Sequence, residues 1–386
     1  MPLAHPLLEP RGLPLPPLVI GVIAAALVAA VGRWWPVRPA GPDRRPDEVW
    51  SWAGRLTGPQ IAGRVLGVVL LLAAIVAGRV GSTDQLENLA PALVVGVAWP
   101  ALLFASAAGG PVWRWLDPWD GMARVVASVS DEGPGDVRPA VAVAVAWTWY
   151  LGVYPDPLSP RAVGLALAVY SIITLGGCIL VGRTRWLARV ELFGLLLGSL
   201  ALLPRGALAG WRAPRGMAAV LGGLAGGLLF GAIRTTELWG GLNAVPGATL
   251  YATLGLIGSC AAGAAILTWL DTPVRPMAVA ALPAVAGIAV ALGMARSRLF
   301  TSLQLLPGLL GDPLGTSPAP PGSLAQRVEV PLAPTRLAAV QLTVVILGCA
   351  VGAMVGAQRG ERLRGEVAAA ILAAAGTTAV ALAPGL

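Results

Sequence analysis

The chain of 386 residues is 56% hydrophobic and only 12% charged, whereas a soluble domain carries about 25% charged residues. With a mean hydropathy of +0.75, this composition excludes an ordinary soluble domain and indicates an all-α polytopic membrane protein. All 27 basic residues are arginine and the net charge is +8. Because most arginines lie in loops between apolar runs, we expect them to set the topology and to meet anionic lipid, with no nucleic-acid partner.

Apolar runs close to the length that a helix needs to cross a bilayer recur along the whole chain. We therefore predict one integral membrane domain, residues 1–386, folded as a transmembrane helical bundle of about ten spans. The predicted spans are residues 15–31, 61–77, 89–108, 139–153, 162–181, 217–233, 248–270, 277–295, 337–355 and 367–382.

The first span is expected to be an uncleaved helix with its N-terminus outside. The N-terminal segment is rich in proline and lacks a basic region, and the positive charge follows the span instead. In the second span, Arg64 lies one turn inside and is expected to reach back to the interface.

The third span leads into Gly109–Arg124, which we interpret as an interface hinge because tryptophan collects where hydrocarbon meets water. Its Asp117–Pro118 pair is typical of a helix N-cap and first turn, so we expect a solvated helix start there. The residues concerned are Trp113, Trp115, Asp117, Trp119 and Asp120, with Arg114 and Arg124 beside them.

Residues 192–203 form an apolar run that is too short to span a bilayer. Arginines lie on both sides, so we predict a re-entrant or interfacial segment that returns to the side from which it came. Arg185, Arg189 and Glu191 precede it, and two interpretations stay open. The three residues either form an ion pair at a segment boundary or line a polar cavity in which Glu191 faces a substrate or ion.

The sixth span carries two rows of glycine at four-residue spacing, which predicts close helix packing. On this basis Gly227→Leu is expected to disrupt packing and Gly227→Ala to be mild. The span ends in a polar group, Arg234, Thr235, Thr236 and Glu237. This group is either a second candidate for a polar cavity or simply in water at the outer interface.

The arginine distribution places residues 113–138 in the cytoplasm and residues 84–88 outside, as expected for the plasma (inner) membrane of a bacterium. Residues 296–336, rich in proline and glycine, are expected to form a long connection with an interfacial helix. The last two spans follow it.

Few residues are suited to covalent or metal chemistry. The chain has one histidine, His5, and its three cysteines lie singly inside apolar runs, where we expect small buried side chains. No phosphate-binding loop or zinc-protease motif occurs. We therefore predict no catalytic residues, no metal and no cofactor.

Several stretches resemble a bacterial family of polytopic membrane proteins whose members carry the name fenitrothion hydrolase or no functional name. They are ENLAPALVVGVAWPALLF (87–104), WRWLDPWDGMAR (113–124), RVELFGLLLGSLALLP (189–204) and LLGDPLGT (309–316), and the sixth span ends in TTELW. The resemblance covers most of the chain and implies a membrane-embedded hydrolase.

The chain departs from the family pattern at positions that matter for chemistry. The family has asparagine at the position of Asp117, a Thr-Phe-Asp pattern near residues 235–237, and histidines near residues 296–298, Cys349 and Ala357. This chain has none of those histidines, so any metal or proton role that they imply is not expected here. The favoured prediction is a permease-like or scaffold protein, with the membrane-embedded hydrolase as the alternative.

Overall fold

The computed structural model describes residues 16–34, 56–129, 135–204, 208–243, 245–271, 278–296, 299–316, 334–358 and 362–382. These residues form helices and turns without a strand, which confirms the all-α prediction. Seven of the described helices are long and apolar enough to cross a membrane. They match seven predicted spans. The predicted spans 139–153, 217–233 and 277–295 correspond to shorter apolar helices.

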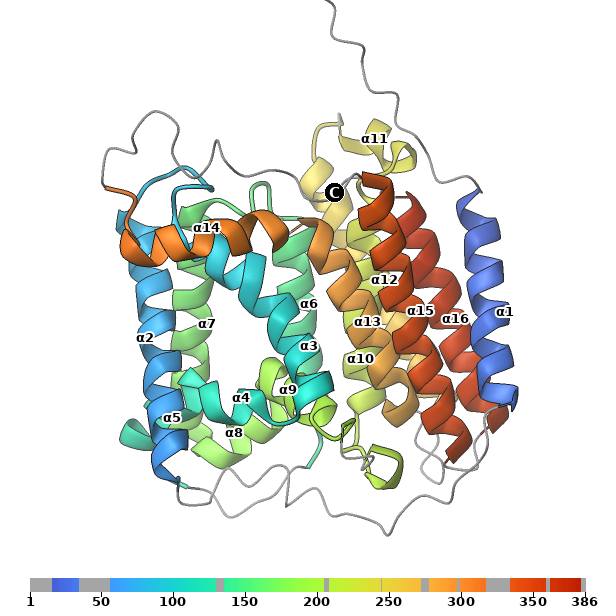
Figure 1. Ribbon diagram of the computed structural model, residues 1–386, viewed down its shortest axis with the longest axis horizontal. Coiled ribbons are helices and arrows are strands. Elements are labelled where there is room, and N and C mark those ends of the chain that lie inside the picture. The colour runs from blue at the N-terminus through green and yellow to red at the C-terminus, as the bar shows by residue number, and fades with distance from the viewer. Residues whose placement is uncertain are drawn as a thin grey trace, which may run out of the picture.

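One half of the molecule consists of four upright helical segments that run side by side (Figure 1). They are α2 (Gly58–Val80), the π-helix η2 (Pro91–Ala98) with its continuation α3 (Trp99–Gly109), α6 (Ala140–Gly152) and α7 (Pro160–Val181). Four short helices close this half at one end, named here the arginine-rich end. They are α4 (Val112–Leu116), α5 (Pro118–Val126), α8 (Arg183–Arg189) and α9 (Leu192–Leu200).

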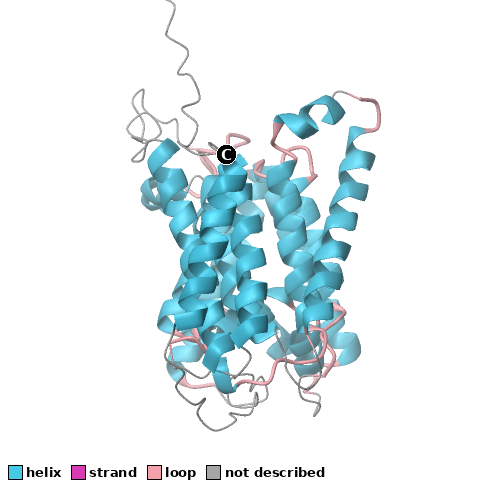
Figure 2. Cartoon of the chain, turned by 90° about the vertical axis from the view of Figure 1, so that its right-hand side faces the viewer, coloured by secondary structure: helices cyan, strands magenta, loops and turns pink. Residues whose placement is uncertain are grey.

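The other half contains the remaining long helices, and it joins the first through contacts of α10 with α6 and of α13 with α3. Figure 2 views the molecule from this side. Its helices are α1 (Pro17–Trp34), α10 (Met217–Ile233), α12 (Ala248–Leu270), α13 (Ala278–Arg296), α15 (Pro334–Gln358) and α16 (Arg362–Leu382). The short η3 (Leu208–Gly210) precedes α10, while α11 (Glu237–Asn243) and α14 (Leu299–Gly311) lie at the end opposite the arginine-rich end.

Glycines let α10 approach two neighbours at once. A Cβ atom built on Gly226 would lie 2.2 Å from the carbonyl oxygen of Ser259 on α12. One built on Gly227 would lie 2.3 Å from Oγ1 of Thr148 on α6. The two glycine rows therefore face α12 and α6 respectively, as close packing requires. The expectation that Gly227→Ala is mild is wrong, because even a methyl group overlaps the Thr148 side chain.

The turn between α7 and α8 depends on Gly182, whose φ of 98° is readily adopted only by glycine. The turn folds α8 back beneath the bundle. The backbone N–H of Arg183 then donates to the carbonyl oxygen of Ser128 at 3.0 Å. This contact ties α8 to the end of α5 and fixes the arginine side chain in the interior, where it is 2% exposed.

Candidate functional site

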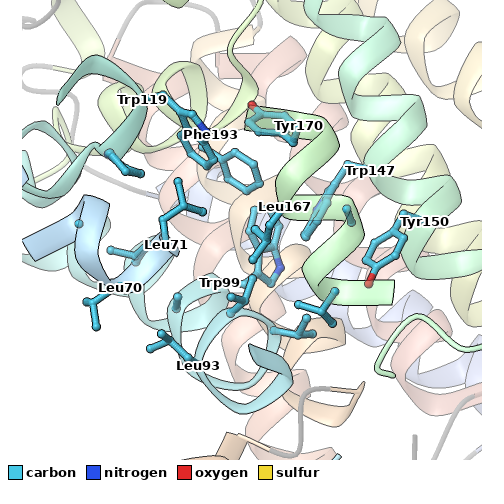
Figure 3. Close-up of a pocket in the computed structure, with 18 of the residues that line it drawn as sticks. Leu70, Leu71, Leu93, Trp99, Trp119, Trp147, Tyr150, Leu167, Tyr170 and Phe193 are labelled. Carbon is cyan, nitrogen blue, oxygen red and sulfur yellow. The ribbon is translucent and has the colours of Figure 1, made fainter. Parts of the chain in front are cut away.

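A cavity of about 550 Å³ lies among α2, η2, α3, α6 and α7 (Figure 3). Leu116, Pro118 and Phe193, from the α4–α5 turn and α9, form its floor toward the arginine-rich end. The volume falls within the roughly 300–1,000 Å³ of small-molecule sites. Its walls are leucine, valine, alanine and aromatic side chains, so the cavity suits an apolar molecule.

Phe193 is the centre of an aromatic cluster in this cavity. Its ring centroid lies 5.5 Å from those of Trp99, Trp147 and Tyr170, and 5.8 Å from that of Trp119. These rings come from α3, α6, α7 and α5, while Phe193 comes from α9. Tilted and offset ring pairs contribute about 0.5–1.5 kcal/mol beyond their buried area. The cluster therefore holds five helices around the cavity.

The wall contributed by η2 is a π-helix of eight residues, flanked by Pro91 at its start and Pro100 just after its end. π-Helical turns are rare and frequently occur at functional sites. The side chains of Leu93, Val94 and Val97 from this segment line the cavity. The altered helical pitch thus shapes a wall of the cavity.

The cavity reaches the outer surface of the bundle. Its lining includes Val169 and Ile173 of α7, which are 45% and 55% exposed, and the exposed Ala101 and Ala146 of α3 and α6. These residues lie within apolar helices, so in a membrane their outward faces meet lipid tails. A molecule could therefore enter the cavity from the bilayer.

Few polar side chains are among the described residues that line the cavity. The Tyr150 hydroxyl donates to the carbonyl oxygen of Pro157 at 2.5 Å, and the Tyr170 hydroxyl donates to Glu191 Oε1 at 2.6 Å. Among the described residues, the indole nitrogens of Trp113 and Trp147 find no hydrogen-bond partner, and both are buried and closed to the cavity.

Two buried carboxyl groups lie behind the floor of the cavity. Asp117 is the N-cap of α5, and its Oδ1 accepts from the backbone N–H groups of Trp119 and Asp120. Its Oδ2 is buried without a partner. Glu191 is the N-cap of α9 and accepts from the backbone N–H groups of Phe193 and Gly194 at 3.0 and 2.5 Å.

Burial disfavours the charged form of both carboxyl groups. It raises the pKa of Asp117 well above its usual range, and the negative charges of Glu191 and Asp120 raise it further. It also raises the pKa of Glu191 to about 7, although the bonds from Tyr170, Gly194 and Phe193 favour the charged form. Burial therefore favours the protonated form of Asp117, while Glu191 lies close to its titration midpoint at neutral pH.

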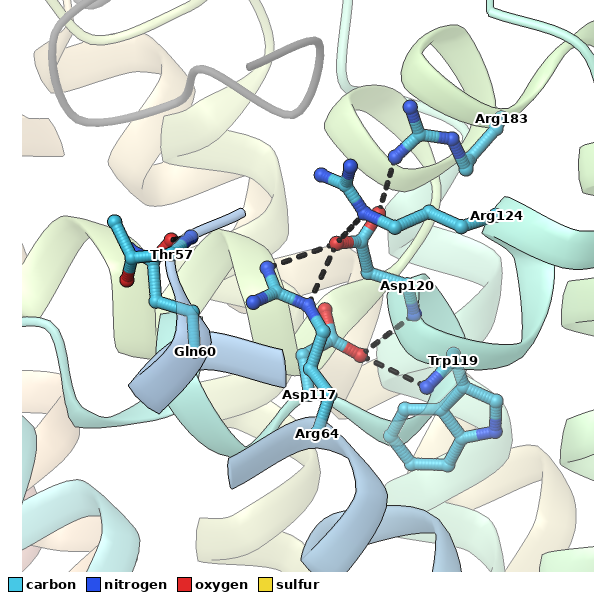
Figure 4. A network of polar contacts seen from close by, with 8 residues as sticks. All are labelled: Thr57, Gln60, Arg64, Asp117, Trp119, Asp120, Arg124 and Arg183. Carbon is cyan, nitrogen blue, oxygen red and sulfur yellow. Dashed lines mark hydrogen bonds and ion pairs between the residues drawn. The ribbon is translucent and has the colours of Figure 1, made fainter. Parts of the chain in front are cut away.

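Asp120, one turn along α5, is the acceptor of three arginines (Figure 4). Its Oδ2 lies 2.8 Å from Nη2 of Arg64 and 2.9 Å from Nε of Arg124, and its Oδ1 lies 2.5 Å from Nη1 of Arg183. Asp120, Arg64 and Arg183 are 0%, 4% and 2% exposed. The network joins α2, α5 and α8 directly beneath the carboxyl pair.

The prediction for the interface hinge is correct in the local structure of the segment and wrong in the exposure of its aspartates. Asp117 caps α5 with Pro118 in the first turn, as predicted. Asp117 and Asp120 are fully buried, however, rather than solvated. Trp115 is 49% exposed, whereas Trp113 and Trp119 are buried in the aromatic cluster. Arg64, which was expected to reach back to the interface, is 4% exposed and pairs with the buried Asp120.

The two groups assigned to a polar cavity lie at opposite ends of the bundle. Arg185 and Arg189, on α8, and Glu191 are at the arginine-rich end. Arg234 and Thr236 are at the other end. Arg234 donates to the carbonyl oxygen of Gly152 at 2.5 Å, and Thr236 donates to that of Ile233. The side chain of Glu237 lies outside the described residues.

The remaining candidates for chemistry are the cysteines and the possible metal ligands. Cys178, Cys260 and Cys349 are free and buried, as predicted. Among the described residues, no three histidine, cysteine, aspartate or glutamate side chains are placed to hold a metal ion.

Several residues of the site could not be recognised in the sequence. Phe193 and Trp99 lie inside apolar runs that gave no sign of a shared cavity, and Tyr170 is an isolated hydroxyl in a predicted span. Arg183 was assigned only to the topology. A usable signal was the isolated charge of Arg64 within an apolar run, since such charges are usually paired or functional.

Comparison with known proteins gives no relative. No family model, no curated protein and no solved structure matches the chain. The resemblance to the fenitrothion hydrolase-like family therefore stays a prediction. The structure itself establishes an all-helical chain whose apolar helices are compatible with a multi-pass membrane protein.

Proposed function

We propose that the chain crosses the membrane ten times, with α6, α10 and α13 as spans in addition to the seven long helices. The chain direction supports this proposal. The helices that follow α3 and α7 lie at the same end, so α6 must return the chain to the other end between them (Figure 1). The same reasoning applies to α10, between α9 and α11, and to α13, between α12 and α14.

In this topology α9 is a re-entrant segment that enters from the arginine-rich end and returns there. Its nine residues cover only about 14 Å of a core of roughly 30 Å. The aromatic ring of Phe193 holds it under the cavity. Gly206, whose position would test the return most directly, lies outside the described residues.

The arginine-rich end is assigned to the cytoplasm of a bacterial cell, with the N-terminus outside. This end carries Arg114, Arg124, Arg138, Arg183, Arg185, Arg189, Arg212 and Arg215. The described arginine side chains near the opposite end are Arg79, Arg161 and Arg234. Cytoplasmic loops carry the excess of arginine, which supports this orientation.

Within this architecture the protein binds an apolar, lipid-like molecule that enters sideways from the bilayer, as a permease-like protein would. The observation that carries the proposal is the aromatic cavity, which extends from Phe193 in the interior to the exposed Ile173 on α7. No charged side chain is among the described residues that line the cavity, which disfavours a polar solute.

The test is photo-crosslinking in membranes with a phospholipid that carries a diazirine at the end of one acyl chain. Mass spectrometry of the digested protein is expected to find adducts on cavity residues such as Trp99 and Trp147. Ala166→Phe, which places a ring in the cavity from α7, should reduce these adducts several-fold. Ala262→Phe is the matched control, because Ala262 is exposed on α12, outside the cavity lining. Adducts confined to outward-facing residues, or equal adducts in both variants, would contradict the proposal.

A further inference from the structure

We propose that Asp117 and Glu191 form a proton-binding site beneath the cavity, in which the pair holds one proton and takes up a second as the pH falls. The proposal rests on the geometry of the two carboxyl groups and does not depend on which molecule occupies the cavity. Both groups are at least 99% buried, being 0% and 1% exposed, and they interact electrostatically.

The hydrogen bonds distribute charge unequally between the two groups. Glu191 accepts three bonds, from the Tyr170 hydroxyl and from the backbone N–H groups of Phe193 and Gly194. These donors stabilise its ionised form. Among the described residues, Asp117 accepts only at Oδ1, and its Oδ2 finds no hydrogen-bond partner. An ionised Asp117 would leave a charged oxygen unsolvated, so the first proton resides there.

The charged and titratable groups around the pair favour a proton over a metal cation. Toward Asp117, α2 presents Arg64 and α5 presents Asp120. Toward the pair, α7 presents Tyr170 and Cys178, and α8 presents Arg183. Asp120 is already bound by three guanidinium groups. Those guanidinium groups repel a metal ion, which would stay in the site as a separate positive charge. A proton instead forms a covalent O–H bond with a carboxyl oxygen.

Protonation of Glu191 has a path that costs little rearrangement. The two backbone N–H groups that cap α9 can only donate, whereas the Tyr170 hydroxyl can donate or accept. A proton added to Oε1 can therefore point at the Tyr170 oxygen, and the hydroxyl reverses its direction. Because Tyr170 also lines the cavity and packs against Phe193, the charge of Glu191 is transmitted to the cavity wall.

The test is infrared difference spectroscopy of the full chain in lipid nanodiscs, titrated between about pH 5 and pH 9. The wild type is expected to show a protonated-carboxyl C=O band that grows as the pH falls through neutrality. Glu191→Gln should remove this titrating band. Tyr170→Phe should raise its midpoint, because the charged form loses a hydrogen bond. Asp117→Asn keeps an oxygen that can cap α5, and it should remove a second protonated-carboxyl band.

Asp84→Asn is the matched control, because Asp84 is exposed and its Oδ1 also accepts a local backbone N–H, that of Leu86. This variant should leave both bands unchanged. A wild type without a carboxyl band that titrates near neutrality would overturn the proposal. So would a titrating band that persists in Glu191→Gln while the protein retains its helical circular dichroism. Failure of lipid crosslinking would remove the proposed cavity ligand and leave the infrared result intact.

Discussion

Gly226→Ala is the substitution whose effect follows most directly from the helix packing. A Cβ at this position would lie 2.2 Å from the backbone oxygen of Ser259, whereas ordinary contact begins at 3.4 Å. The helices α10 and α12 must therefore separate locally by roughly the 1.2 Å difference. The Ser259 hydroxyl, which donates to the Gly226 carbonyl oxygen at 2.8 Å, would be displaced as well.

The matched control is Gly223→Ala on the same helix. Its Cβ would meet Val141 at 3.7 Å, an ordinary van der Waals distance. Both substitutions change glycine to alanine inside a helix, so their intrinsic helix propensities cancel in the comparison. Overpacking a close interface costs about 1–3 kcal/mol. Gly226→Ala should therefore be less stable than Gly223→Ala by about 1–3 kcal/mol.

The assay is reversible unfolding in mixed micelles, followed by circular dichroism as the fraction of SDS increases. The free energy of unfolding is compared between the two variants and the wild type. Equal stability of the two variants would refute the reasoning, because α10 and α12 could not then be in backbone contact at Gly226.

Four further predictions follow from the same structure. Cysteines at the exposed positions 83 and 128 should react with an impermeant maleimide from opposite sides, the first outside; labelling of both from one side would refute the topology. The pKa of Glu191 is raised to about 7, so the protonated Glu191 stabilises the folded state. This stabilisation is complete below the unfolded pKa near 4.5 and is lost as the pH rises through 7. Thermal stability should therefore fall over that interval by at most about 1.4 kcal/mol per pH unit, and a slope undiminished in Glu191→Gln would contradict this. Asp120→Ala should destabilise by about 3–5 kcal/mol, because the buried guanidinium groups of Arg64 and Arg183 lose this ion pair. The same change at exposed Asp84 should have little effect, and similar losses at both sites would show the network to be unimportant. Purified protein should not hydrolyse phosphotriesters above background with or without zinc, and metal-dependent turnover that one carboxylate substitution abolishes would restore the hydrolase prediction.

The seven long helices could be predicted because each coincides with one predominantly apolar run. The cap at Asp117 could also be predicted, since an N-cap bond joins residues only two or three positions apart. In both cases the interactions that determine the structure join residues that are close together in the sequence. A short sequence window therefore contains the necessary information.

The burial of the charged residues could not be predicted in the same way. Arg64 pairs with Asp120 at a separation of 56 residues, and nothing in the sequence around either residue specifies its partner. The aromatic cluster likewise draws on residues from 99 to 193, and its membership depends on how five helices pack. The glycine rows of α10 indicated close contact, but only the assembled bundle identifies α12 and α6 as their neighbours.

The central claim is that the aromatic cavity holds an apolar molecule taken from the bilayer. The most direct measurement is a cryo-electron microscopy map of the protein in nanodiscs formed from its own membrane lipids. We expect elongated non-protein density that starts beside Phe193, passes Trp147 and reaches the bilayer near Ile173. A map that resolves these side chains and shows either an empty cavity or one closed by the side chains themselves would contradict the claim.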